Sequence, residues 1–158
     1  MEGYRVHLKY GICCVKEIQE DYVQLTVLDD PGLSIKVPVE KLDERTRPVY
    51  TVSELSEVFH QLQIQDVPWQ RSALERKSRR EQWLRSDAMA SKISLLIDLF
   101  QGFGFYTEKN KKVPVSDLKL FEHVADPLIL EISFVMHLDH AGAKQKLEEV
   151  LHSRSINQ

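Results

Sequence analysis

The segment Arg47-Pro48-Val49 separates two halves of the chain that differ in their hydrophobic periodicity. In residues 1–46, apolar and polar positions alternate in short runs, which is the pattern of half-buried β-strands. Beyond the segment, apolar residues recur at helical spacing, and the box Thr51-x-x-Glu54 is a typical start for a helix. The chain is therefore predicted to be an α+β protein, with a small antiparallel β-barrel or sheet followed by an all-α helical domain.

The first half is expected to form four strands, at residues 4–10, 12–18, 22–28 and 33–39. In the third strand, Val23, Leu25 and Val27 share one face. The last two strands are joined by Asp29-Asp30-Pro31-Gly32, since Asp and Pro start turns and Gly supplies positive φ. Pro38 removes one backbone donor, so the fourth strand is expected to end or to lie at a sheet edge there.

The second half begins with a helix that carries apolar residues on one stripe from Val52 to Leu62. After a short connector, a second helix is expected from about Trp69 to Leu84. Ser86 or Asp87 can then cap the helix that follows, because short polar side chains bind the free N–H groups of a helix start.

The remaining third of the chain shows three further features. Gln101 to Pro114 contains two glycines and a lysine run, so it is expected to be an exposed loop. Pro127 is expected to kink the next helix or to restart it. A last helix is expected at Ala141–Leu151, and the segment 154–158 is expected to fray.

Composition places the chain among soluble globular proteins. Its 158 residues are 42% hydrophobic and 28% charged, with a net charge of −3. No apolar run approaches the roughly 18–20 residues that a membrane helix needs, and the N-terminus lacks the profile of a signal peptide, so a cytoplasmic location is expected. The adjacent Cys13 and Cys14 point to opposite faces of a strand, which makes a shared metal or a redox role unexpected.

Positive charge is concentrated in one stretch. From Trp69 to Lys92 there are seven basic residues against three acidic ones, inside a chain that is acidic as a whole. Such a surface attracts phosphate weakly and in a salt-dependent way. The alternative is a solvated helix face with pairs such as Glu75–Arg79 and Lys77–Glu81. The candidate phosphate-contacting residues are Arg71, Arg76, Lys77, Arg79, Arg80 and Arg85.

The order of several segments resembles the CarD/CdnL family of bacterial transcription regulators. These segments are Leu33–Val39, Arg47-Pro48-Val49, Pro68-Trp69 with its basic helix, Ser86-Asp87 and Ile93–Phe100. The resemblance implies that residues 1–48 form a Tudor-like domain that binds the β subunit of RNA polymerase. It also implies that the helical domain, residues 51–153, lies against promoter DNA and stabilises the open complex.

The resemblance further implies particular contact residues. Lys36, with Val37 and Pro38, is expected at the polymerase interface; the alternative for Lys36 is the solvent face of an alternating strand. Trp69 is expected to pack against the minor groove at the edge of the melted region, as apolar wedges do. Its alternative is burial between helices, and Trp83 is the competing tryptophan.

Three features depart from the family pattern. The turn after the first strand keeps only Gly11 of the family's Tyr-Pro-x-His-Gly pattern. The loop after the second strand is shortened to Gln19-Glu20-Asp21, where relatives carry a basic residue implicated in polymerase contact. The stretch from Trp69 to Ser86 is about one helical turn longer than expected, which would displace the basic face.

Catalytic and metal chemistry are not expected. His137-x-x-His140 lacks a third ligand, and the sequence contains no Gly-x-Ser-x-Gly elbow or phosphate-binding glycine loop. The sequence thus predicts a non-enzymatic transcription regulator without cofactor, metal or small-molecule substrate. It would associate with the nucleoid through RNA polymerase, and its weak contact with DNA would depend on that tether. The rival hypothesis is a two-part protein-interaction scaffold that does not contact DNA.

Overall fold

The structure is a computed structural model that describes residues 3–154. The chain divides into two compact units, Met1–Thr51 and Val52–Gln158. The first contains an antiparallel five-stranded sheet, and the second consists of helices, so the α+β prediction is confirmed.

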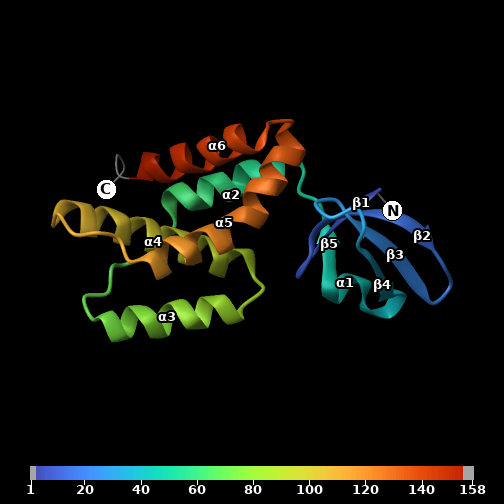
Figure 1. Cartoon of the computed structure of the whole chain (residues 1–158), viewed down its shortest axis with the longest axis horizontal. Coiled ribbons are helices and arrows are strands. Elements are labelled where there is room, and N and C mark those ends of the chain that lie inside the picture. Colours follow the sequence, from blue (N-terminus) through green and yellow to red (C-terminus); the bar gives the residue numbers. More distant parts are fainter. Residues whose placement is uncertain (1–2, 155–158) are drawn as a thin grey trace. The chain divides into compact units, whose positions relative to one another are not determined.

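The N-terminal unit is built around the sheet, whose strands lie in the order β4-β3-β2-β1-β5, with antiparallel neighbours (Figure 1). A 3₁₀ turn at Val39–Lys41 and the short helix α1 (Leu42–Arg45) connect β4 to β5. The strands are β1 (Tyr4–His7), β2 (Gly11–Ile18), β3 (Tyr22–Val27), β4 (Ser34–Pro38) and β5 (Thr46–Pro48).

One face of the sheet forms the core of this unit. The three apolar residues predicted to share a face of β3 do so, and they pack with Val37 of β4 and Leu42 of α1. Each buried Val or Leu stabilises the fold by about 1.5–3 kcal/mol relative to leaving it exposed. The alternation of β3 therefore determines which side of the sheet is covered.

The first strand is shorter than predicted and ends at His7. The Nδ1 atom of His7 accepts a hydrogen bond from the backbone N–H of Lys9 at 3.0 Å, which closes a tight turn. Gly11 then takes a φ of +77°, a conformation that suits glycine. The turn buries the polar His7 and leaves Leu8 41% exposed, the reverse of what hydrophobicity alone indicates.

Pro38 lies at the end of edge strand β4, as predicted. The other edge strand, β5, was not predicted. It pairs with β1 through Arg5–Pro48, Val6–Arg47 and His7–Thr46. Because it comprises only three residues, β5 shows no alternation that could distinguish it from a loop.

The helical unit contains α2 (Val52–Ile64), α3 (Ala73–Arg85), α4 (Met89–Glu108), α5 (Val115–Met136) and α6 (His140–Ser153). Helix α4 packs against α2, α3 and α5, and α6 packs against α2 and α5. Buried side chains such as Leu62, Leu96, Ile132 and Leu147 form its core. Helix α3, by contrast, contains no buried residue.

Helices α4 and α5 differ from the prediction because tertiary packing overrides local preference. Helix α4 continues through Gly102 to Glu108, where a loop was expected, and its Phe103 packs edge-on against Phe121 at 5.3 Å. Helix α5 is continuous through Pro127, where a break was expected. Pro127 is exposed, while residues that follow it, such as Leu128 and Ile129, pack into the core.

Arg154 is held in place by hydrogen bonds, although fraying was expected there. This side chain is buried and donates hydrogen bonds to the carbonyls of Leu62 at 2.6 Å and Gln65 at 2.9 Å. The expectation was therefore wrong at Arg154, because its guanidinium binds carbonyls at the end of α2. Residues 155–158, for which fraying was also expected, lie outside the described part of the chain.

We expect acid to destabilise the N-terminal unit through His7. Burial lowers the pKa of His7 below its ordinary value of 6.5, and the charges of Arg45 and Lys9 lower it further. The folded state thus favours the neutral ring, whose stabilising effect is complete above pH 6.5 and is lost as the pH falls through the folded pKa.

The variant His7→Asn tests this, because Asn keeps a hydrogen-bond acceptor and does not titrate. Urea unfolding of the full chain at neutral and mildly acidic pH, followed through the NMR signals of Val23 and Val37, should show a smaller acid loss in the variant. An equal loss in both proteins would mean that His7 is not responsible.

Candidate functional site

The outer edge of β4 presents backbone groups to solvent. The N–H of Val27 donates to Leu33 O and the N–H of Val39 donates to Asp21 O, both at 3.1 Å. Since hydrogen-bonded pairs alternate along an antiparallel ladder, the odd-numbered residues of β4 bond toward β3. The N–H and C=O groups of Ser34 and Lys36 therefore point outward.

The three residues predicted for polymerase binding have different exposures on this strand. Lys36 is exposed, and its Nζ lies 4.8 Å from the ring centre of Tyr22 on β3. Pro38 is half-buried, and the side chain of Val37 is fully buried in the core. The edge thus presents the side chains of Lys36 and Pro38, whereas Val37 supports it from below.

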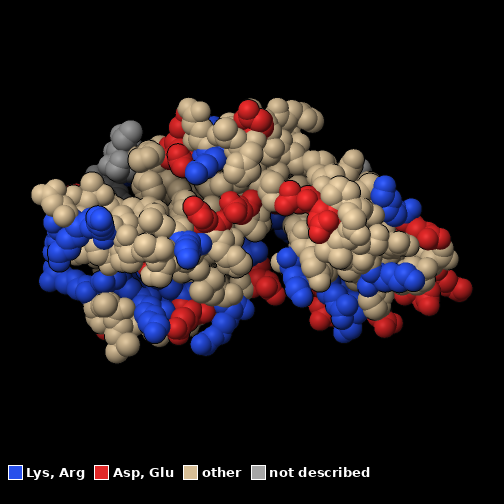
Figure 2. Space-filling view, in the orientation of Figure 1, with Lys and Arg blue, Asp and Glu red and all other residues tan. Residues whose placement is uncertain are grey.

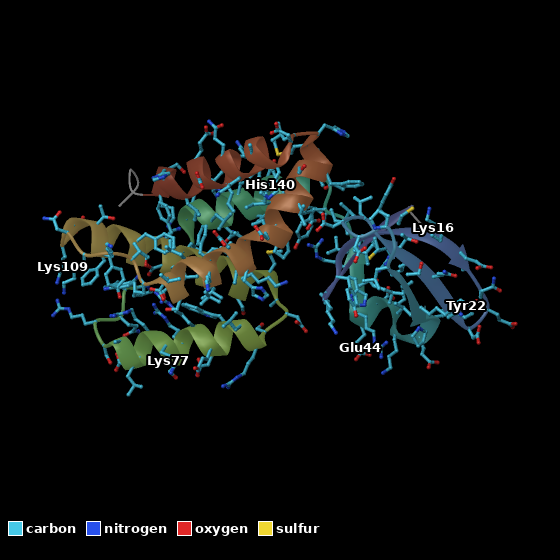
Figure 3. All side chains as sticks on the ribbon, in the orientation of Figure 1. Lys16, Tyr22, Glu44, Lys77, Lys109 and His140 are labelled. Carbon is cyan, nitrogen blue, oxygen red and sulfur yellow. The ribbon has the colours of Figure 1, made fainter. Side chains whose placement is uncertain are left out.

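A β-bulge places another cation near the shortened hairpin. The pairing of β2 with β3 shifts between Val15 and Glu17, so Lys16 is the extra residue. Lys16 is exposed, and Figure 3 labels it on β2. The hairpin loop itself is closed by the N–H of Gln19, which donates to Tyr22 O at 2.8 Å. Lys16 was not predicted from the sequence. A β-bulge is a shift in the pairing of two strands, and the pattern of apolar residues within one strand does not reveal it.

Trp69 lies outside α3, in the connector that precedes it. The helix begins at Ala73, because the Ser72 hydroxyl accepts a hydrogen bond from the N–H of Glu75 and caps the helix start. Helix α3 therefore starts four residues later than predicted.

Trp69 is half-buried and packs against α4. Its ring centre lies 5.4 Å from that of Phe105, and the Arg76 guanidinium lies 4.6 Å from the indole ring. Gly102 permits this approach, because a Cβ there would lie 3.2 Å from the Cη2 atom of Trp69. The indole thus takes the position described by the packing alternative, with part of its surface still accessible.

Two of the predicted phosphate-binding arginines are held inside the helical unit. Arg79 donates to Asp98 at 2.7 Å and Arg80 donates to the same carboxylate at 2.8 Å, while Arg80 also pairs with Asp117 at 3.3 Å. The side chain of Asp98 is 0% exposed. Arg79 also donates to the carbonyl of Pro68 at 2.7 Å. These two arginines attach α3 to the bundle, and their side chains are only 19% and 11% exposed.

The other four predicted cations differ in exposure. Arg71, Lys77 and Arg85 are exposed, and Arg76 is half-buried, donating to the carbonyls of Gln70 and Arg71. Figure 2 shows that lysine and arginine side chains gather on the face of the helical unit around α3, and Figure 3 labels Lys77 there. The basic face predicted from sequence therefore exists, with a smaller set of available residues.

Comparison with known families assigns the N-terminal unit. Residues 4–50 match the CarD-like/TRCF RID domain, which is the RNA polymerase-interacting domain of CarD-like proteins. The match runs from the first residue of β1 past the end of β5, so it spans the whole sheet. The predicted resemblance to CarD-like proteins is confirmed for this unit. The matched domain is a protein-interaction domain rather than a catalytic one.

No curated protein matches the chain in a sequence search. Within residues 3–154, no helix is both long enough and apolar enough to cross a membrane. In the same residues, His, Cys, Asp and Glu side chains do not gather in groups of three or more that would suit a metal ion.

We expect Asp98→Asn to loosen α3 from the bundle. The change leaves Arg79 without its buried counter-charge and leaves Arg80 with Asp117 alone, and removal of one partner of a buried ion pair typically costs about 3–5 kcal/mol. We expect about 3 kcal/mol, because both arginines keep some contact with water.

Urea unfolding followed by tryptophan fluorescence measures the loss, since Trp83 lies on α3, Trp69 lies in the connector before it, and the chain has no other tryptophan. Asp126→Asn, which removes an exposed carboxylate from α5, is the matched control. Equal stability of the two variants would show that the Asp98 cluster does not anchor the helix.

Proposed function

We propose that this protein is a non-enzymatic transcription regulator that binds the β subunit of RNA polymerase with its N-terminal unit. The match of residues 4–50 to an RNA polymerase-interacting domain carries this proposal. Under it, the protein acts in the cytoplasm and associates with the nucleoid through the polymerase.

The edge of β4 supports a particular mode of binding. Ser34 and Lys36 direct backbone donors and acceptors outward, so a strand of the polymerase can pair with them and extend the sheet. Main-chain bonds of this kind supply affinity, and side chains beside them select the partner and the register. Lys36 lies at the centre of that edge, where an acidic partner residue would meet its ammonium group.

Charge reversal at Lys36 tests this mode. Lys36→Glu should weaken capture of purified RNA polymerase by about tenfold or more, because it places a carboxylate in the middle of the docking edge. Lys9→Glu is the matched control, since Lys9 is also an exposed lysine of the same unit stacked on a tyrosine, Tyr10, at 5.3 Å. Similar polymerase affinity for both variants would remove β4 from the interface.

For the helical unit, we propose contact with promoter DNA near the melted region. Arg71, Lys77 and Arg85 are exposed and belong to the same helical unit. They can bind DNA phosphates, and such contacts do not depend on the base sequence. The contact is weak in the free protein and becomes effective when the polymerase holds the chain nearby. A regulator that binds the open complex better than the closed one shifts the equilibrium toward opening by that difference in affinity.

Trp69 is proposed to contribute its accessible edge to the opened DNA. Its packing against α4 supports the indole in one orientation, which lowers the entropy lost on contact. Contacts between aromatic side chains and bases are worth roughly 1–3 kcal/mol, so Trp69→Ala should shorten the open-complex lifetime about fivefold to a hundredfold.

The Trp69→Ala assay must distinguish the loss of a DNA contact from unfolding of the variant. Open-complex lifetime is therefore measured below the unfolding temperature of the variant, which is determined by tryptophan fluorescence of Trp83, and polymerase binding is measured in parallel. A folded variant that binds polymerase and leaves the lifetime unchanged would exclude the wedge. If the wild-type chain itself does not alter promoter opening, the rival scaffold function is favoured.

A further inference from the structure

We propose that the loop Lys109–Lys112 forms, together with Arg71 and Arg76, a second patch that binds the phosphate backbone of duplex DNA. This inference rests on the proposed DNA contact of the helical unit. It adds a segment that lies far from α3 in sequence, and it moves the main phosphate contacts toward the end of the unit where α3 begins.

Four side chains in series connect the loop to the start of α3. Arg76 stacks on Trp69 at 4.6 Å, Trp69 packs on Phe105 at 5.4 Å, and the Nζ of Lys109 lies 4.5 Å from the ring centre of Phe105. The two aromatic rings thus have a cation on either side. Because each of these distances is short, the positive groups of α3 and of the loop belong to one continuous surface.

The backbone holds the loop in a defined shape. Asn110 has a φ of 54°, in the left-handed region, and its N–H donates to Thr107 O at 3.1 Å. The N–H of Lys111 donates to Tyr106 O at 2.9 Å. These two bonds are those of a Schellman motif, which ends α4 and reverses the chain direction. The lysines that follow are therefore positioned by the helix end rather than carried on a free segment.

Charge and exposure at this end suit a polyanion. Lys109, Lys111, Lys112 and Arg71 are exposed, and the adjoining carboxylates of Glu75 and Glu108 leave the patch with a clear positive excess. Figure 2 shows lysine and arginine side chains gathered at the end of the helical unit where α4 finishes and α3 begins, and Figure 3 labels Lys109 there. The exposed side chains of this patch are mainly lysines, which are depleted in protein–protein interfaces, so the patch matches a phosphate backbone better than it matches a protein surface.

Two arginines in the middle of α3 are engaged inside the helical unit and are therefore less available to DNA. Arg79 and Arg80 neutralise the buried Asp98, so the middle of α3 has less charge to offer than its sequence indicates. Lys109 instead lies over the ring of Phe105, and an aromatic ring leaves the charge of an ammonium group intact. The effective positive surface thus lies at the loop and the start of α3.

The test compares two double variants of the full chain in a complex with RNA polymerase and promoter DNA. Lys111→Gln with Lys112→Gln removes two charges from the patch, and Lys144→Gln with Lys146→Gln removes two from α6. The measured quantity is the concentration of chain that half-saturates its effect on open-complex lifetime, as a function of salt. The log–log salt slope should fall by about 0.9 for each phosphate that the loop variant no longer binds, and it should not change in the α6 variant.

Photo-crosslinking from single positions distinguishes failure of this inference from failure of the proposed DNA contact. A crosslinker at position 111 should label DNA, one at 36 should label polymerase, and one at 144 should label neither. Labelling of DNA from position 77 but not from 111, or labelling of polymerase from 111, would overturn this inference while leaving a DNA-contacting or protein-contacting helical unit in place. Absence of DNA labelling from both 77 and 111 would overturn the proposed DNA contact and this inference with it.

Discussion

The carboxylate of Asp98 determines how the helical unit presents its basic surface. It is completely buried in α4, and a carboxylate in that position is tolerated only if it is neutralised. Arg79 and Arg80 supply that neutralisation from α3, a helix with no buried residue of its own. The position of α3 is therefore set by charge pairing and by the packing of Trp69, rather than by an apolar stripe.

This arrangement gives the arginines of α3 two different roles. The pair at 79 and 80 turns inward and fixes the orientation of the helix about its axis. With that orientation fixed, Lys77 and Arg85 are left exposed to solvent. The side of α3 that faces the bundle is thus also charged. A count of basic residues in the sequence does not distinguish the arginines on this side from those that face solvent.

Periodicity predicted the features that depend on local sequence. The alternation of Val23, Leu25 and Val27 predicted the core face of the sheet, and Pro38 predicted an edge, because both effects act within one strand. The pairing of Arg80 with Asp98 could not be predicted in this way, because the two residues lie on different helices and each has several possible partners.

The same limit explains the errors at helix boundaries. Helix α4 continues through a segment that resembles a loop, and Gly102 in that segment permits the close approach of Trp69 instead of forming a turn. In the candidate site, periodicity did not predict which side chains are exposed. Val37 and Arg79 have the expected chemistry, but their side chains are directed toward the interior.

The termination of β4 at Pro38 has a consequence for self-association. If two copies of the chain paired this strand along its full length, the two Lys36 residues would face each other across a two-fold axis, and like charges directly opposite are unfavourable. Ser34 would then lie opposite Pro38, which has no N–H to give it. An exposed edge strand can pair with further copies of the same chain and lead to aggregation. In β4, Lys36 and Pro38 disfavour such self-pairing but still allow a strand of a different protein to pair with this edge.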